Sequence, residues 1–188
     1  MKNLYFITSN KGKVAEVKEK VKSFDINIIQ KDLGYPEIQA DSLEEVAQYG
    51  VEYIRKEFSH SFILEDAGLF IDSLEGFPGV YSKYVFYTIG LAGILKLMEN
   101  KKIRSAVFRS VYAYAKPNTK PILFIGECKG TITTKEKGIG GFGYDPIFIP
   151  EDKSKTFAEM AAEEKNRYSH RGKALEKIIE FLKKKKDK

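Results

Sequence analysis

Short apolar runs alternate along this chain with longer segments in which apolar residues recur every three or four positions. The runs predict buried strands, and the longer segments predict amphipathic helices with one face toward a core. We expect strands at residues 4–7, 26–29, 62–64, 69–71, 105–115, 121–133 and 147–149. We expect helices after residue 10, after residue 42, around residues 91–98 and from about residue 169 onward.

Local signals mark where several of these elements begin or end. Ser42 and Glu45 form a capping-box pattern, which predicts a helix start. Residues 116–120 suit the turn of a hairpin between two long strands. The sequence Asp66-Ala67-Gly68 predicts a break between two short strands, because glycine permits a sharp change of backbone direction.

A long hairpin beside strand–helix units predicts an α/β fold with a mixed sheet. The 188 residues show neither an internal repeat nor an obvious linker, and this length suits one domain that spans residues 1–188. The hydrophobic fraction of 43% and the aromatic fraction of 13% provide enough apolar surface for a core, which argues against disorder.

The net charge changes this picture little. The chain has 32 Lys and Arg against 26 Asp and Glu, for a net charge of +6. Residues 183–188 contain five Lys and one Asp, so this basic C-terminal tail supplies +4 and leaves +2 for the rest. We interpret the tail as a solvated helix end, because no aromatic residue is interleaved with its lysines as in many nucleic-acid-binding segments.

The compartment follows from what the sequence lacks. The single cysteine, Cys128, cannot form an internal disulfide, so nothing indicates an oxidising environment. The apolar runs are too short to span a membrane, and no secretory signal is visible before residue 8. We therefore expect a cytoplasmic protein without a membrane partner.

The segment from Thr8 to Lys13 lies between a predicted strand and a predicted helix. Free backbone N–H groups and the positive end of the helix dipole favour an anion there. Asn10 adds an amide donor and Lys13 a cation, which suits a phosphate group. The segment is not a Walker A loop, since Val14 replaces the Ser or Thr that would hold magnesium. On position alone, an ordinary capped helix start with exposed lysines is the favoured explanation.

Three carboxylates are candidates for metal binding or for activation of water. Glu65 and Asp66 close an apolar strand, and Glu37 follows Pro36 in an extended segment. Together such groups bind a hard cation with phosphate oxygens as its other ligands. Each of them alone is also typical of a polar turn or of a surface residue.

Two further segments carry groups suited to a flat, polar ligand. Glycines flank Phe142 in the segment 140–146, so that its ring face is accessible to a stacked base. Residues 164–171 include His170 and Arg171 beside a helix start, where several donors gather. The alternatives are a core aromatic residue and an N-cap serine with exposed neighbours.

In combination, the order and spacing of these segments resemble the inosine triphosphate pyrophosphatase family, whose members hydrolyse non-standard purine nucleoside triphosphates. The resemblance extends from Thr8 to Arg171. Its most specific motifs are Thr8-x-Asn10-x-x-Lys13, Glu65-Asp66-x-Gly68-Leu69, Gly76-x-Pro78-Gly79-x-Tyr81-Ser82, Phe142-Gly143-Tyr144-Asp145-Pro146 and Ser169-His170-Arg171. The resemblance implies an elongated, twisted mixed sheet with a cleft between two lobes, a homodimer and dependence on Mg²⁺.

The resemblance also implies a role for each matching position. Glu37 and Asp66 would bind the metal, with Glu65 as a further ligand, and Asp66 would be the general base. Asn10 and Lys13 would hold the triphosphate, Lys83 would lie on the phosphate or base side, and Phe142 would stack on the purine. The residues that would read the edge of the base and support the nucleotide are Asp145, Lys165, His170 and Arg171. The further substrate-binding positions would be Thr8, Gly143 and Tyr144. The products would be a nucleoside monophosphate and pyrophosphate.

The sequence departs from the family pattern at two positions. Ala67 stands where many members have Ser or Thr, and Gly50 stands where many bacterial members have a lysine. Neither change removes a metal ligand or the base, so we expect activity to be retained. Two other functions stay open on the residues alone: a nucleotide- or RNA-binding protein without catalysis, and a hydrolase that releases single phosphates.

Overall fold

A mixed seven-stranded sheet forms the centre of the computed structural model, which describes residues 2–36 and 38–184. The strands are β1 (Lys2–Ile7), β2 (Ile26–Lys31), β3 (Phe62–Ile71), β4 (Pro78–Gly79), β5 (Ser105–Ala115), β6 (Ile122–Ile132) and β7 (Phe148–Pro150). The α-helices are α1 (Lys11–Val21), α2 (Leu43–Ile54), α3 (Ser82–Thr88), α4 (Gly90–Leu97), α5 (Ala162–Tyr168) and α6 (His170–Lys184). Short 3-10 turns cover Asp72–Leu74, Asp145–Ile147 and Phe157–Glu159.

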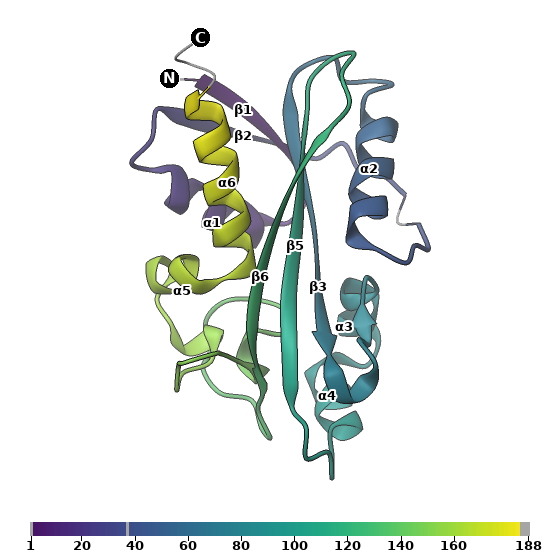
Figure 1. The fold of residues 1–188 in the computed structure, drawn as a ribbon, viewed down its shortest axis with the longest axis vertical. Helices are drawn as coiled ribbons and strands as arrows, with labels where there is room; N and C mark the ends of the chain where they lie inside the picture. Colours follow the sequence, from purple (N-terminus) through teal and green to yellow (C-terminus); the bar gives the residue numbers. More distant parts are fainter. Residues whose placement is uncertain (1, 37, 185–188) are drawn as a thin grey trace.

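The order of strands in the sheet is β2-β1-β3-β5-β6-β7, and β4 pairs with β3. β1 pairs in parallel with β2 and β3, whereas β3–β5, β5–β6 and β6–β7 are antiparallel. The long strands β3, β5 and β6 run along the longest axis of the molecule and give it an elongated shape (Figure 1).

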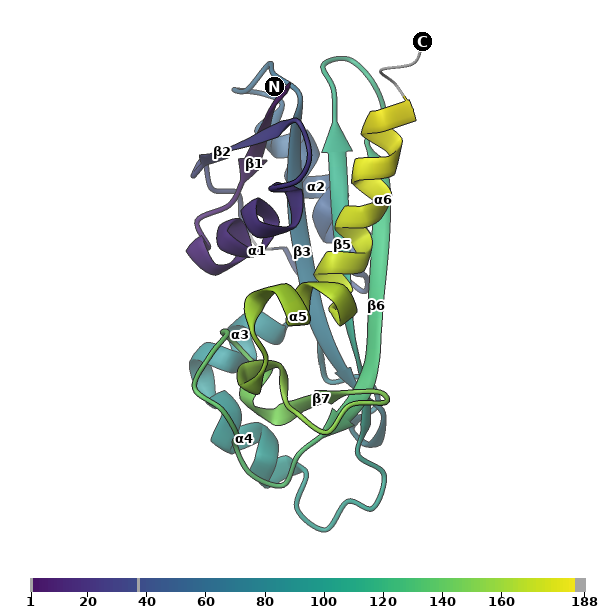
Figure 2. The ribbon, with the colours of Figure 1, turned by 90° about the vertical axis from the view of Figure 1, so that its left-hand side faces the viewer.

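Helices cover both faces of this sheet. α6 packs on β5 and β6, and α1 and α5 pack against α6 on the same side, whereas α2 packs on β3 and β5 from the other side (Figures 1 and 2). The buried apolar residues form three clusters. One lies beneath α1 and α6, one beneath α2, and one at the far end of the long strands with α3, α4 and β7.

The predicted fold class is confirmed, and most of the predicted elements are present. Val14, Val17 and Val21 are buried on one face of α1, and the hairpin of β5 and β6 pairs along almost its whole length. Ser42 caps α2 by accepting from the Glu45 N–H, at 3.2 Å. The division into two lobes stays a prediction.

The predicted break at Asp66-Ala67-Gly68 is wrong, since β3 is continuous from Phe62 to Ile71. β5 pairs with β3 across this stretch and keeps it extended. Gly68 is required for a close contact rather than for a turn, because a Cβ atom there would lie 2.3 Å from the Gly79 carbonyl oxygen. Sequence periodicity also did not predict α3 and α5, which are only seven residues long.

One edge of β3 is open in its middle. β5 covers the other edge throughout, whereas this edge pairs with β1 at residues 62–64 and with β4 at residues 69–70. Among the strand pairings of the described residues, residues 65–68 therefore have no partner on this side. The acidic motif Glu65-Asp66 lies in this opening. No helix between residues 2 and 184 has the length and apolar character needed to cross a membrane.

Candidate active site

A pocket of about 650 Å³ lies beside the open edge of β3. This volume is within the range of roughly 300–1,000 Å³ that is usual for small-molecule sites. The predicted site residues that line it are Thr8, Asn10, Lys13, Glu65, Asp66, Lys83, Phe142, Gly143, Tyr144, Asp145, His170 and Arg171. Lys165 does not line the pocket but contacts Asp145 from behind. Glu37 lies outside the described residues.

The start of α1 forms the wall of the pocket that suits an anion. The Asn10 side-chain Oδ1 accepts from the Lys13 N–H at 3.1 Å and so caps the helix. The Asn10 N–H donates to the Thr8 hydroxyl, also at 3.1 Å. Because Oδ1 is used for capping, the Nδ2 group of Asn10 is its remaining donor. The capped helix start and the phosphate-binding segment are thus compatible interpretations of the same residues.

Glu65 and Asp66 are neighbours on β3 with different surroundings. Glu65 is buried, and its carboxylate accepts from the Ser110 hydroxyl at 2.7 Å and from Arg171 Nε at 3.2 Å. Lys13 Nζ lies 2.7 Å from Glu65 Oε2 and donates to the Glu65 carbonyl at 3.0 Å. Asp66 is half-buried and lines the pocket. Of the two carboxylates, Asp66 is the one that remains accessible to a ligand.

Acidic and basic side chains alternate in a series of ion pairs beneath the pocket, called the charged series below. Lys165 Nζ is 2.5 Å from both Asp145 Oδ2 and Glu16 Oε1. Arg171 bridges Glu16 Oε2, at 2.5 Å, and the Glu65 carboxylate. The series continues to Lys13 and contains three acidic and three basic side chains, so it is neutral overall. It joins the start of α1 to the 142–145 loop and to α6.

Burial and the neighbouring charges shift the pKa values of two of the acidic groups in opposite directions. Burial alone raises the pKa of Glu65, but the charges of Arg171 and Lys13 outweigh it and lower the pKa to about 2. Burial raises the pKa of Asp145 although the Lys165 ammonium opposes it. A buried carboxylate that loses its cation would be strongly destabilising, so each member of the series holds its neighbour in place.

His170 contributes a neutral imidazole to the pocket wall. It is buried at the start of α6, and its ring stacks on Phe108 with centroids 4.6 Å and planes 8° apart. Burial, with the Arg171 charge adding to it, holds the pKa of His170 well below its usual value of 6.5. His170 Nδ1 is buried and has no hydrogen-bond partner within the described part of the chain.

The 142–145 loop is fixed to α3 as well as to the charged series. The Phe142 N–H donates to Asp145 Oδ2 at 2.8 Å. The Tyr144 hydroxyl donates to the Ser82 carbonyl at 2.7 Å, next to the pocket residue Lys83. The Ser82 hydroxyl in turn accepts from Leu69 N–H and donates to the Gly79 carbonyl. Tyr144 is therefore a buried support for the loop, and both Tyr144 and Phe142 line the pocket.

Residues 4–181 match the family model described as the Ham1 family. The chain belongs to the Ham1 family. It is 53% identical to the dITP/XTP pyrophosphatase of Pyrococcus horikoshii over 96% of each chain, and 51% identical to that of Methanopyrus kandleri over 95% of each chain. The solved Ham1 protein of Staphylococcus aureus has 28% identity and a TM-score of 0.83, covering 98% of this chain and 100% of its own. The resemblance stated from the sequence motifs is confirmed.

Several buried polar residues beneath the pocket of this Ham1 chain were not predicted from the sequence. Glu16 shares a face of α1 with Lys13 and Val17, and an acidic residue on a buried helix face signals a basic partner elsewhere in the fold. Ser110 and Tyr112 are two residues apart on β5, so their side chains share the face that contacts the charged series. The Tyr112 hydroxyl is buried without a hydrogen-bond partner among the described residues. Nothing in the sequence of β5 indicated these polar contacts.

The two departures from the Ham1 pattern have different structural consequences. Ala67 lines the pocket with a methyl group and supplies no hydroxyl. At Gly50, the space for a side chain is filled by Tyr35, because a Cβ atom would lie 3.0 Å from Tyr35 Cε2 and 3.1 Å from Leu64 Cδ2. Tyr35 itself lines the pocket.

The donor set in the pocket fits a magnesium ion that arrives with phosphate. The described residues contain no group of three or more His, Cys, Asp or Glu side chains placed to hold a metal. Magnesium is commonly bound by one or two carboxylates together with water and substrate phosphates. Asp66 and Asp32 both line the pocket and meet that smaller requirement.

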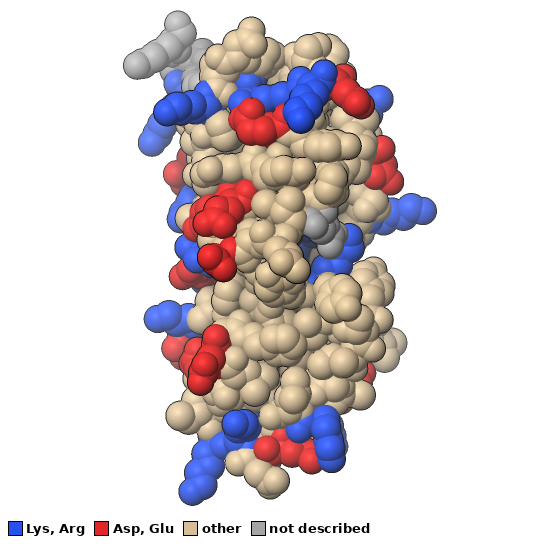
Figure 3. Space-filling view, turned by 90° about the vertical axis from the view of Figure 1, so that its right-hand side faces the viewer, with Lys and Arg blue, Asp and Glu red and all other residues tan. Residues whose placement is uncertain are grey.

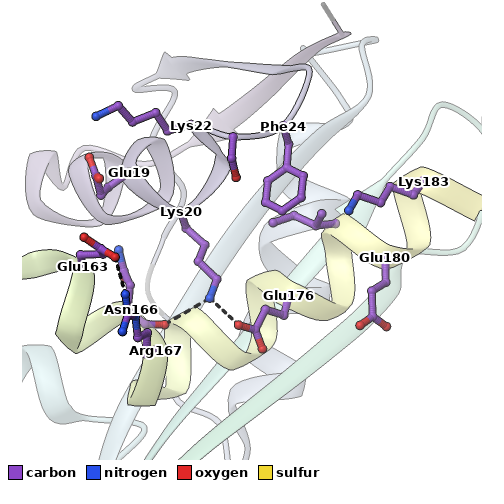
Figure 4. A pocket seen from close by; sticks show the side chains of 12 residues that line it. Glu19, Lys20, Lys22, Phe24, Glu163, Asn166, Arg167, Glu176, Glu180 and Lys183 are labelled. Carbon is purple, nitrogen blue, oxygen red and sulfur yellow. Dashed lines mark hydrogen bonds and ion pairs between the residues drawn. The ribbon is translucent and has the colours of Figure 1, made fainter.

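A second pocket of about 540 Å³ lies on the outer side of α1, between α1, α5 and α6 (Figure 4). Lys20 crosses it, with Nζ 3.4 Å from the Asn166 carbonyl oxygen and in an ion pair with Glu176 (Figure 4). Acidic and basic side chains alternate around its rim, so it selects neither sign of charge. None of the site residues predicted from the sequence line it.

Proposed function

We propose that this protein hydrolyses non-standard purine nucleoside triphosphates, namely ITP, dITP and XTP, to the nucleoside monophosphate and pyrophosphate. Such an activity removes these nucleotides from the cellular pool, which also leads us to propose a cytoplasmic location. The observation that carries the proposal is that one pocket collects the triphosphate-binding, acidic and base-binding motifs from five distant parts of the chain. The names of the relatives support the same substrate class.

The start of α1 is proposed to bind the triphosphate. Backbone N–H groups, the Asn10 amide and the Lys13 ammonium offer hydrogen bonds and positive charge at one end of the pocket. Lys83, at the start of α3, adds a second cation on the pocket wall. Glu65 keeps Lys13 and Arg171 in position, which is the role that its contacts support best.

Mg²⁺ is the proposed cofactor, and when bound it neutralises phosphate charge so that a nucleophile can approach. Asp66 would hold it together with Glu37 and phosphate oxygens, with Glu65 as a neighbouring carboxylate. Asp66 is also the proposed general base, because it is the acidic residue of β3 that the pocket exposes. It accepts a proton from water, the water oxygen bonds to the α-phosphorus, and the bond from that phosphorus to the β-bridging oxygen breaks.

Selection of the base is proposed to occur at the other end of the pocket. Phe142 offers an aromatic face, and Asp145, His170 and Arg171 offer polar groups around it, with Lys165 supporting Asp145. Hypoxanthine and xanthine carry an oxygen at position 6, which accepts hydrogen bonds. Adenine carries an amino group there, so an Arg171 N–H that Glu16 and Glu65 do not use would face another donor, at about 1–3 kcal/mol for each mismatch.

The test is to incubate the purified protein with Mg²⁺ and either ITP or ATP, and to identify the products by phosphorus NMR. We expect inosine monophosphate and pyrophosphate from ITP, and little turnover of ATP. Release of inorganic phosphate in place of pyrophosphate would favour the hydrolase that removes single phosphates. Absence of turnover with every purine triphosphate would contradict an enzymatic function.

We further propose that the protein is a homodimer. The face that carries α2 and α3 shows a broad central band of uncharged residues, with Lys, Arg, Asp and Glu mainly around its margins (Figure 3). Tyr49 and Tyr53 on α2 and Tyr81, Tyr84 and Tyr87 on or beside α3 are exposed. Exposed tyrosines of this density are typical of protein interfaces.

A further inference from the structure

The second residue of α1 lies unusually close to the aromatic ring of the pocket. A Cβ atom built on Gly12 would lie 2.7 Å from Phe142 Cδ1 and 2.9 Å from Phe142 Cε1. Gly12 does not have a positive φ angle, so its backbone conformation would accept any residue. Glycine in a helix is less favourable than alanine by roughly 0.5–1 kcal/mol. The third near atom, Asn10 Oδ1, would lie 3.1 Å away, so the contact with Phe142 is the closest one that a side chain at this position would meet.

The backbone that carries the ring is held by hydrogen bonds, so the ring can move away only by rotation of its own side chain. The Phe142 N–H donates to Asp145, which is itself bonded to Lys165. A Cβ atom at the preceding Gly141 would lie 2.1 Å from Asp145 Oδ2, so this part of the loop also packs tightly. The cations approach the ring too, with Lys165 Nζ 4.7 Å and Arg171 Cζ 5.2 Å from its centroid.

We propose that Gly12 is a positioning residue for substrate selection. Because it has no side chain, the Phe142 ring can lie directly against the first turn of α1. The same turn carries Asn10 and Lys13, so the contact fixes the separation between the ring that stacks on the base and the residues that hold the triphosphate. This inference rests on the proposed function. A side chain at residue 12 shifts the ring and misaligns a purine whose triphosphate is already bound.

The test is a double-mutant cycle with Gly12→Ala, Phe142→Ala and the double variant. We expect Gly12→Ala to raise the KM for ITP about tenfold, within the range that loss of a base-stacking contact causes. In the Phe142→Ala background the same substitution has no ring to displace, so its effect falls to less than about twofold. An equal rise in both backgrounds, or no rise in the presence of Phe142, would overturn the proposal.

Thermal unfolding of the same variants supplies a readout that does not depend on activity. Alanine favours the helix, so Gly12→Ala should raise the Tm when Phe142 is absent and should not raise it when Phe142 is present. Equal shifts of Tm in both backgrounds would contradict the contact itself. If the wild type lacked pyrophosphatase activity, the proposed function would fail while this comparison would still decide whether Gly12 seats the ring.

Discussion

Two adjacent carboxylates on β3, Glu65 and Asp66, have different surroundings. Glu65 is enclosed by Ser110, Lys13 and Arg171, whereas Asp66 faces the pocket. Successive side chains of a strand point to opposite faces, so this separation follows from the continuous strand. Glu65 therefore contacts the buried cations, and Asp66 lines the pocket as the proposed general base.

We predict that Asp66→Asn abolishes turnover of ITP but largely spares nucleotide binding. The amide has the shape of the carboxylate but cannot accept a proton from water. Turnover would be measured by pyrophosphate release and binding by calorimetry in the same buffer. Glu99→Gln, an exposed residue far along the chain, is the control for a general effect of removing a carboxylate. Near-normal turnover in Asp66→Asn would exclude Asp66 as the base.

The low pKa of Glu65 predicts that the folded protein loses stability in acid. Its pKa is about 2 in the folded protein, against an ordinary value of 4.5, so the folded state favours the ionised form. This contribution, on the order of 3 kcal/mol, is complete above pH 4.5 and is lost as the pH falls toward 2. Urea unfolding between pH 6 and pH 3 should show a smaller decline for Glu65→Gln than for the wild type. Parallel curves would show that Glu65 is not responsible.

At the scale of elements, α1 links the two ends of the pocket. Its first turn carries the proposed phosphate-binding residues, and Glu16 on its buried face contacts Lys165 of α5 and Arg171 of α6. The Asn166 side chain donates to the Glu16 carbonyl at 3.1 Å and adds a second contact between α5 and α1. The position of the base-binding groups thus depends on how α1 docks against α5 and α6.

Glu16→Gln should destabilise the protein by about 3–5 kcal/mol, because two buried cations lose part of their compensation. The matched control is Glu19→Gln on the exposed side of the same helix, where about 0.5 kcal/mol or less is expected. Urea unfolding of both variants provides the comparison. Similar free energies of unfolding for the two variants would mean that the charged series contributes little to stability.

The elements with strong apolar periodicity could be predicted from the sequence, and those held by tertiary contacts could not. The valines of α1 and the long hairpin carry their own signals. α3 is short and rich in aromatic and β-branched residues, and its start is fixed by Ser82 contacts to β3 and β4. Motif residues of the site were recognisable, but Glu16, Ser110 and Tyr112 acquire their roles only from partners distant in the sequence.

At the scale of the whole molecule, the tyrosine-rich face of α2 and α3 predicts dimerisation. Tyr84 is 68% exposed on this face. Tyr84→Glu should convert a dimer to a monomer, because burying an unpaired carboxylate is unfavourable. Light scattering coupled to size exclusion gives the mass directly. Lys18→Glu, on the exposed side of α1, is the control and should leave the mass unchanged. A monomeric wild type would contradict the proposal.

The open edge of β3 also bears on how the protein avoids the growth of fibrils. Unpaired strand edges can template the growth of fibrils by adding strands from other molecules. Here the opening spans only residues 65–68 and is closed at either end by β1 and β4. A typical strand of about 5–6 residues is too long to enter it. This opening in the sheet can therefore offer main-chain polar groups to a small ligand without admitting a strand from another molecule.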